Sequence, residues 1–89
     1  MTNNKKTKIE LYVIDKIKSI RIDKGFTQED IAEILDTTRG FIGQMESHKY
    51  PTKYNLNHLN TLAIEFGISI REFFPEKPIK ENLKRKKQK

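Results

Sequence analysis

Residues 25–46 have the sequence Gly-Phe-Thr-Gln-Glu-Asp-Ile-Ala-Glu-Ile-Leu-Asp-Thr-Thr-Arg-Gly-Phe-Ile-Gly-Gln-Met-Glu, which holds two short helical patterns separated by a break. Thr27, with Asp30 three residues later, predicts a capping box at the start of the first pattern. Residues 36–38 end it, because three Asp and Thr side chains in a row compete with a helix for backbone hydrogen bonds. The apolar face of the first pattern is formed by Ile31, Ala32 and Leu35.

The second pattern restarts with Ile42 and Met45 and predicts a short helix over residues 37–47. Two helices that meet at a steep angle need a small residue at their contact, and Ala32 is suited to that place. The second helix of such a pair projects far enough to enter the major groove of DNA. The sequence therefore predicts a helix-turn-helix whose second member is a recognition helix.

Two longer helices are expected on either side of this unit. Apolar residues at three-to-four spacing predict one from about Leu11 to Lys24, ended by Gly25 as a C-cap. Asn55 can cap another, which Gly67 would end. Their apolar faces hold Val13, Ile17 and Ile20 in the first and Leu56, Leu59, Leu62, Ala63 and Phe66 in the second.

A last short helix is expected after Gly67, opened by the capping-box pair Ser69 and Glu72 and closed by Pro75. The predicted fold class is thus all-α, a compact five-helix domain with the helix-turn-helix at helices two and three. We expect residues 11–75 to form this domain, between a flexible arm over 1–10 and a basic, disordered tail over 76–89.

The composition narrows the possible functions. The 89-residue chain has no cysteine, which excludes disulfides and thiolate metal sites, and His48 and His58 lack clustered carboxylates, so we predict no metal and no cofactor. No nucleophile and base are suggested, so we predict that the protein is not an enzyme. No apolar run approaches membrane-spanning length, and we expect a cytoplasmic protein without a membrane partner.

The net charge of +6 is concentrated in the tail. Residues 76–89 hold seven basic residues against Glu76 and Glu81, so the rest of the chain is almost neutral. Bulk charge is therefore a weak argument for nucleic-acid binding by the domain, and the positions of particular residues must carry it. For the tail we favour a nonspecific DNA arm over a segment that folds on an acidic partner or a solubilising end.

Three segments, residues 20–32, 37–46 and 59–74, resemble the Cro and phage-repressor family of helix-turn-helix proteins, also called XRE-like. The first has Ile-Arg-Ile-Asp-Lys-Gly-Phe-Thr-Gln-Glu-Asp-Ile-Ala, the second Thr-Thr-Arg-Gly-Phe-Ile-Gly-Gln-Met-Glu, and the third ends in Phe-Gly-Ile-Ser-Ile-Arg-Glu-Phe-Phe. The resemblance covers roughly residues 17–75 and implies a lambda-repressor-like fold that binds DNA.

The helix over 37–47 would offer DNA its first turn and the face opposite Ile42 and Met45. Arg39 can pair with guanine, Gln44 with adenine, and Thr38 with a phosphate or a thymine methyl. The resemblance implies base reading at Arg39, Gly40 and Gln44, while Phe41 could equally pack against the following loop. The predicted base-reading residues are Thr38, Arg39, Gly40, Phe41, Gly43 and Gln44.

Phosphate contacts are predicted at two places beside this helix. Gln28 lies in the first turn of the preceding helix, capped by Thr27, where free N–H groups and the helix dipole favour a phosphate oxygen, and the resemblance implies a phosphate clamp there. Side chains of the following loop would grip the adjoining backbone and make binding salt-dependent. The predicted phosphate-binding residues are Thr27, Gln28, Lys49, Tyr50, Lys53 and Tyr54.

The resemblance also implies a structural ion pair between Arg21 and Glu46, which would fix the angle of the recognition helix. The sequence departs from the family's pattern at Asp36, where the family usually has a glycine in the turn. Such a position tends to need positive φ, which aspartate tolerates better than most residues. Gly40 and Gly43 each cost roughly 1 kcal/mol relative to alanine inside a helix.

Together these features predict a sequence-specific transcriptional regulator of double-stranded DNA, a repressor that binds a palindromic operator as a homodimer. The alternatives are an antitoxin with a toxin as its protein partner, and a protein-interaction module that reuses the fold without reading DNA. The dimer interface is expected at one of two apolar groups: Ile70, Phe73 and Phe74, or Ile9, Leu11 and Tyr12. For Phe73, closure of the core is an equally good interpretation.

Overall fold

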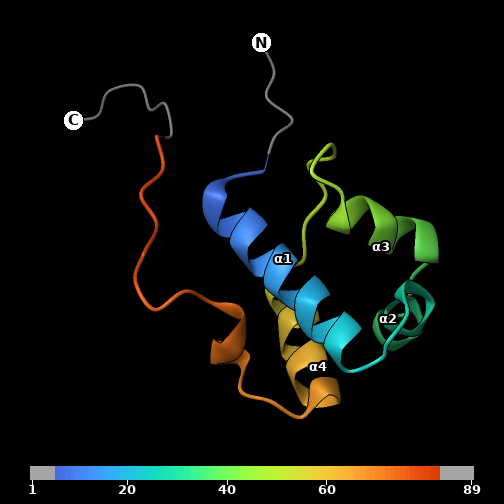
Figure 1. Cartoon of the computed structure of the whole chain (residues 1–89). Coiled ribbons are helices and arrows are strands. Elements are labelled where there is room, and N and C mark those ends of the chain that lie inside the picture. The colour runs from blue at the N-terminus through green and yellow to red at the C-terminus, as the bar shows by residue number, and fades with distance from the viewer. Residues whose placement is uncertain (1–5, 83–89) are drawn as a thin grey trace.

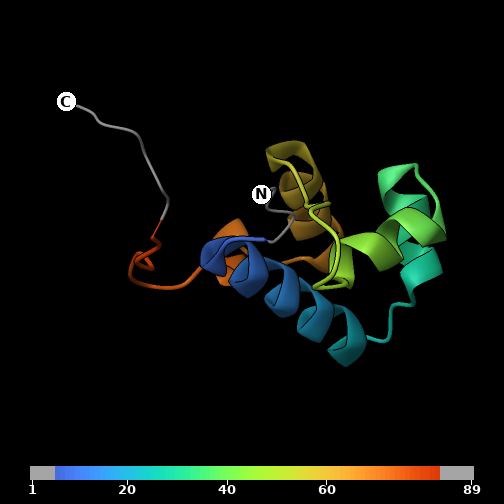
Figure 2. The same ribbon diagram turned by 90° about the horizontal axis from the view of Figure 1, so that it is seen from above.

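A computed structural model describes residues 6–82 of the chain and contains four α-helices and one 3-10 helix (Figure 1). They are α1 (Lys8–Asp23), α2 (Gln28–Leu35), α3 (Arg39–Glu46), α4 (Leu56–Phe66) and the 3-10 helix η1 (Ile70–Phe73). Helices α2 and α3 lie together at one end of the molecule, and η1 lies toward the other (Figures 1 and 2). No helix within 6–82 is both long enough and apolar enough to span a bilayer.

The expectation of five α-helices was wrong. The segment after Gly67 forms only the four-residue 3-10 helix η1. The Ser69 side chain there accepts from the Arg71 N–H, and not from the Glu72 N–H that the predicted capping box would use. Pro75 restricts Phe74 to the extended conformation that it adopts here, φ −111° and ψ 152°. Too few residues therefore remain between Ser69 and Pro75 for an α-helix to establish its hydrogen bonds.

Local capping explains where three of the α-helices begin. Thr7 and Glu10 form a capping box at α1, Thr27 and Asp30 one at α2, and Asn55 with His58 one at α4. Helix α1 thus starts at Lys8, earlier than the expected Leu11. Helix α4 ends at Gly67, whose φ of 70° is a left-handed conformation that glycine adopts without steric cost.

The core is formed where all five helices meet. Phe66 is central to it, because its ring makes edge-on contacts with Phe26 and Phe73 at centroid distances of 5.3 and 6.2 Å. Phe73 is fully buried and belongs to the core, whereas Phe74 is 38% exposed. Leu56, which was expected on the buried face of α4, is 76% exposed, since it occupies the first position of that helix, beyond the edge of the core.

The expected N-terminal arm and basic tail fall partly on residues 1–5 and 83–89, which lie outside the described residues. Within the described part, Lys6 is buried and only 6% exposed. The segment after η1 runs back toward the start of α1, where a side-chain oxygen of Glu81 accepts from the Lys8 N–H at 2.7 Å (Figure 1). A carboxylate is favourable there because it lies at the positive end of the α1 dipole.

Candidate nucleic-acid interface

The connection between α2 and α3 is a tight turn over residues 36–38. Asp36 adopts a left-handed conformation, φ 57° and ψ 51°, at the end of α2. The Thr37 N–H then donates to the Ala32 carbonyl at 2.8 Å, which satisfies one of the last carbonyls of the helix. Ala32 is buried at this junction, so a larger side chain would push the two helices apart.

Helix α3 has one face in the core and one in solvent. Ile42 and Met45 are fully buried, and Glu46 is nearly so. Phe41 and Gly43 are half-buried, and Phe41 packs against the core. The solvent-exposed residues at the start of the helix and along its outer face are Thr38, Arg39, Gly40 and Gln44.

The first turn of α3 lies beside the first turn of α2. Thr38 caps α3 through its hydroxyl, which accepts from the Phe41 N–H at 3.1 Å. Arg39 borders an open depression that is also lined by Thr27 and Gln28. Two helix N-termini and the Arg39 guanidinium therefore meet around this depression and attract anions, while Arg21, which also lines it, is paired with Glu46, and the Glu29 carboxylate at its edge opposes them. The fold thus brings together predicted base-reading and phosphate-binding residues.

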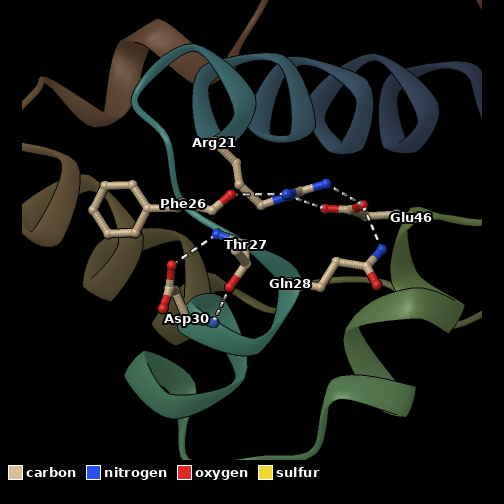
Figure 3. A network of polar contacts seen from close by, with 6 residues as sticks. All are labelled: Arg21, Phe26, Thr27, Gln28, Asp30 and Glu46. Atoms are coloured by element: carbon tan, nitrogen blue, oxygen red, sulfur yellow. Dashed lines mark hydrogen bonds and ion pairs between the residues drawn. The ribbon is translucent and has the colours of Figure 1, made fainter.

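A buried polar network connects α1, α2 and α3 through the carboxylate of Glu46 (Figure 3). Arg21 donates to both Glu46 oxygens, from Nε at 2.8 Å and from Nη2 at 3.0 Å, and Gln28 donates from Nε2 to Glu46 Oε1 at 3.0 Å. Arg21 also donates to the Phe26 carbonyl at 2.8 Å. This bidentate geometry fixes the inner face of α3 against the other two helices.

The amide nitrogen of Gln28 is therefore already bound to Glu46. The side-chain oxygen of Gln28 faces Gly43, where a side chain would reach ordinary contact distance, 4.0 Å. A phosphate at the start of α2 would therefore be bound by the backbone N–H groups of the first turn more readily than by the Gln28 amide nitrogen.

The loop between α3 and α4 is attached to α1 by an ion pair between Lys53 and Glu10 and by an exposed polar contact between His48 and Asp15. Lys53 Nζ lies 2.8 Å from Glu10 Oε2, and His48 Nε2 lies 3.1 Å from Asp15 Oδ1. Burial opposes ionisation of Glu10, but its contacts with Lys53 and Thr7 outweigh that effect and hold its pKa below the usual value.

Four predicted phosphate-binding residues lie in this loop, and their surroundings differ. Lys49 and Tyr50 are exposed, while the Lys53 ammonium is engaged by Glu10. Tyr54 is a core residue, and its hydroxyl is buried without a hydrogen-bond partner. Burial, with the nearby Glu46 charge, raises the pKa of Tyr54. A phosphate contact would need this hydroxyl to be exposed, so the predicted role of Tyr54 does not fit its burial.

Two contacts at the end of α3 were not predicted. Lys6 Nζ donates to the carbonyls of Gln44, Met45 and Ser47, and the Thr52 hydroxyl donates to Gln44 Oε1 at 3.3 Å. The lysine lies 38 to 41 residues from its acceptors in a polar segment without periodicity, so the sequence carries no signal for this contact.

Within residues 6–82, no three His, Asp or Glu side chains gather in a way that could hold a metal ion. The side chains at the outer face of α3 are donors and acceptors of hydrogen bonds. Their arrangement is therefore suited to binding a partner through hydrogen bonds.

Comparison with known proteins gives the fold. No protein-family model and no curated protein matches the chain. Among solved structures, the chain is similar to the crystal structure of a hypothetical transcription factor, NHTF, from Neisseria, with a TM-score of 0.60 and 18% sequence identity. The similarity covers 74% of this chain and 75% of that chain. At this identity the likeness shows a shared arrangement of helices.

Proposed function

We propose that this protein is a transcriptional regulator that binds double-stranded DNA in a sequence-specific way through the outer face of α3. The observation that carries the proposal is the exposure of Arg39 and Gln44 on a helix whose opposite face is fixed in the core. A helix exposed in this way can enter the major groove, where the edges of all four base pairs differ. The likeness to a solved structure described as a hypothetical transcription factor supports this interpretation.

Arg39 and Gln44 are assigned the base-specific contacts. The guanidinium of Arg39 can donate two bonds to guanine, and the amide of Gln44 can pair with adenine by donating and accepting. The Thr52 hydroxyl binds Gln44 Oε1, which orients this amide and leaves its NH2 group free to donate. Thr38 and Gly40 complete the exposed reading surface, with Gly40 permitting close approach of the backbone, and the half-buried Phe41 and Gly43 border it.

Phosphates on either side are assigned to two groups. One is the start of α2, with Thr27, Gln28 and the free backbone N–H groups of its first turn. The other is the loop after α3, where Lys49 and Tyr50 are exposed, and where Lys53 would exchange Glu10 for a phosphate. These contacts set the register and give salt dependence without sequence information.

We further propose that this protein is a repressor that binds a palindromic operator as a homodimer, because one α3 covers only a short half-site and a symmetric pair would cover two. Ile9, Tyr12 and Phe74 are exposed, and Ile9 and Phe74 line one shallow pocket beside α1. This surface joins members of both apolar groups that the sequence suggested for dimerisation. An antitoxin would make the same DNA contacts and would differ in using such a surface for a toxin.

The test is selection of duplexes from a random pool with the full-length chain, followed by titration of the selected site. We expect enrichment of a palindrome and two chains per site. Arg39→Ala and Gln44→Ala should each lower affinity for that site by roughly 10- to 100-fold, as expected for one bidentate base contact. Arg71→Ala is the matched control, because Arg71 is also an exposed arginine but lies in η1, and it should have little effect. Binding without enrichment and insensitive to both α3 variants would favour the interaction module instead.

A further inference from the structure

Lys6 precedes α1 in the chain, yet its side chain ends at the far end of α3. Its ammonium nitrogen lies 3.2 Å from the Gln44 carbonyl oxygen and 3.0 Å from that of Met45, and it also binds the Ser47 carbonyl. Only 6% of the residue is exposed, which is rare for a lysine. Three acceptors around one ammonium group match its three N–H donors.

Helix α3 needs such a partner because its own sequence provides little at this end. Helices α2 and α4 end in left-handed residues, Asp36 and Gly67. In each case the N–H of this residue and the N–H of the next residue donate to carbonyls in the last turn of the helix. Helix α3 ends instead in Ser47, which is extended and contributes a single N–H to the Gln44 carbonyl. Its last carbonyls would otherwise be left to water.

The charge of Lys6 also suits this position. A helix C-terminus carries partial negative charge, and a cation there is stabilising. Glu10 and Asp15 are the nearby acidic groups; burial lowers the pKa of Lys6, and these two charges oppose that effect. The next residue, Thr7, caps α1, so the position of Lys6 is fixed by the start of that helix.

We propose that Lys6 is a positioning residue for α3: its buried ammonium caps the C-terminus of this helix and holds it at a fixed angle against α1. The ordering of α3 by Lys6 stands independently of any ligand. The consequence for DNA rests on the function proposed above, since Gln44 both reads a base in that proposal and supplies one of the three carbonyls. The segment before α1 is thereby part of the reading apparatus without touching DNA.

The test replaces Lys6 by methionine, which keeps the aliphatic stem and removes the ammonium group. Lys8→Met is the matched control, because Lys8 is exposed and its substitution causes the same loss of charge two residues away. Amide hydrogen exchange of α3 should accelerate roughly 3- to 30-fold in Lys6→Met relative to α2 and α4, and stay unchanged in Lys8→Met. The internal comparison with α2 and α4 separates local loosening from global unfolding.

Affinity for the selected duplex gives the second readout. Lys6→Met should weaken it by roughly 10-fold without changing the slope of log affinity against log salt. Loss of a direct phosphate contact would reduce that slope by about one. Unchanged exchange in α3 would overturn the proposal whatever the salt slope. If the wild type binds no duplex while exchange behaves as expected, the positioning role stands and the DNA function fails.

A milder variant covers the case in which Lys6→Met does not fold. Lys6→Gln keeps two N–H donors without the charge and should give the same pattern at a smaller size. Exchange of α3 at the wild-type rate in a folded Lys6→Gln variant would overturn the proposal.

Discussion

Helices α2 and α3 have the same length, eight residues, but they are stabilised in opposite ways. Helix α2 has a reciprocal capping box at its start and a left-handed Asp36 at its end, so both ends are satisfied by neighbours in sequence. Helix α3 has one capping contact from Thr38, two glycines within it, and an end that depends on Lys6.

The difference shows where the angle of α3 is determined. Its inner face is fixed by Arg21, its end by Lys6 and its Gln44 side chain by Thr52, and all three contacts come from other elements. A helix of low intrinsic stability folds when tertiary contacts compensate. Helix α3 should therefore respond to substitutions far away in the sequence, whereas α2 should respond mainly to its own.

The largest effect is expected at the buried ion pair. Glu46→Gln keeps the shape of the side chain but leaves the Arg21 guanidinium, whose side chain is only 10% exposed, without its carboxylate. We expect the free energy of unfolding to fall by about 3 kcal/mol, measured by urea denaturation. Amide exchange should show α3 opening before α2.

The control for this substitution is an exposed polar contact. Asp15→Asn removes the partner of His48, and both side chains of that pair are more than half exposed. The change should be below about 1 kcal/mol. A Glu46→Gln variant as stable as Asp15→Asn would show that the buried pair does not hold α3.

The same contrast explains what could be predicted from the sequence. The capping residues Thr27 and Asp30 and the break at residues 36–38 are local signals, and α2 and its turn were placed correctly from them. The box formed by Thr7 and Glu10 is a signal of the same kind that went unused, so the start of α1 was predicted too late. The fifth α-helix was wrong because a capping-box pattern says nothing about the length available before Pro75.

Long-range contacts lie beyond such signals. The burial of Tyr54, in a loop expected at the surface, depends on its joining the same core cluster as Val13, Ile14 and Leu59. The contact of Lys6 with α3 depends on how the chain returns in space. The exposure of Arg39 and Gln44 agrees with the helical spacing, and their contacts with DNA stay a prediction.

A second test asks whether the glycines make α3 intrinsically weak. A methyl group at Gly40 would meet only the Thr38 hydroxyl, at 4.0 Å, so Gly40→Ala fits without strain. It should raise the free energy of unfolding by about 1 kcal/mol. Affinity for the selected duplex should nevertheless fall, because the added methyl lies on the exposed face that, in the proposed function, approaches the bases.

Gly67→Ala is the opposing control for Gly40→Ala. Gly67 has a φ of 70°, so alanine there is strained and should destabilise the protein by roughly 1 kcal/mol. Loss of stability in Gly40→Ala as well would mean that helix propensity does not limit α3.

The smallest effect concerns a local cap that can titrate. The Asn55 N–H donates to Nδ1 of His58 at the start of α4, which requires this nitrogen to be unprotonated. Burial lowers the pKa of His58 from its ordinary 6.5, so the fold favours the neutral form. Its contribution is complete above pH 6.5 and is lost as the pH falls through the lower value of the folded state. The free energy of unfolding, measured from pH 7.5 down to about 5, should fall by less than about 1 kcal/mol, the size of one capping contact.

Glutamine can accept the same bond at every pH, so His58→Gln should remove this pH-dependent loss of stability, while His48→Gln should keep it. Because this cap is local to α4, amide exchange of α3 should not follow the titration, and a matching change in α3 would contradict the separation between locally and distantly stabilised helices.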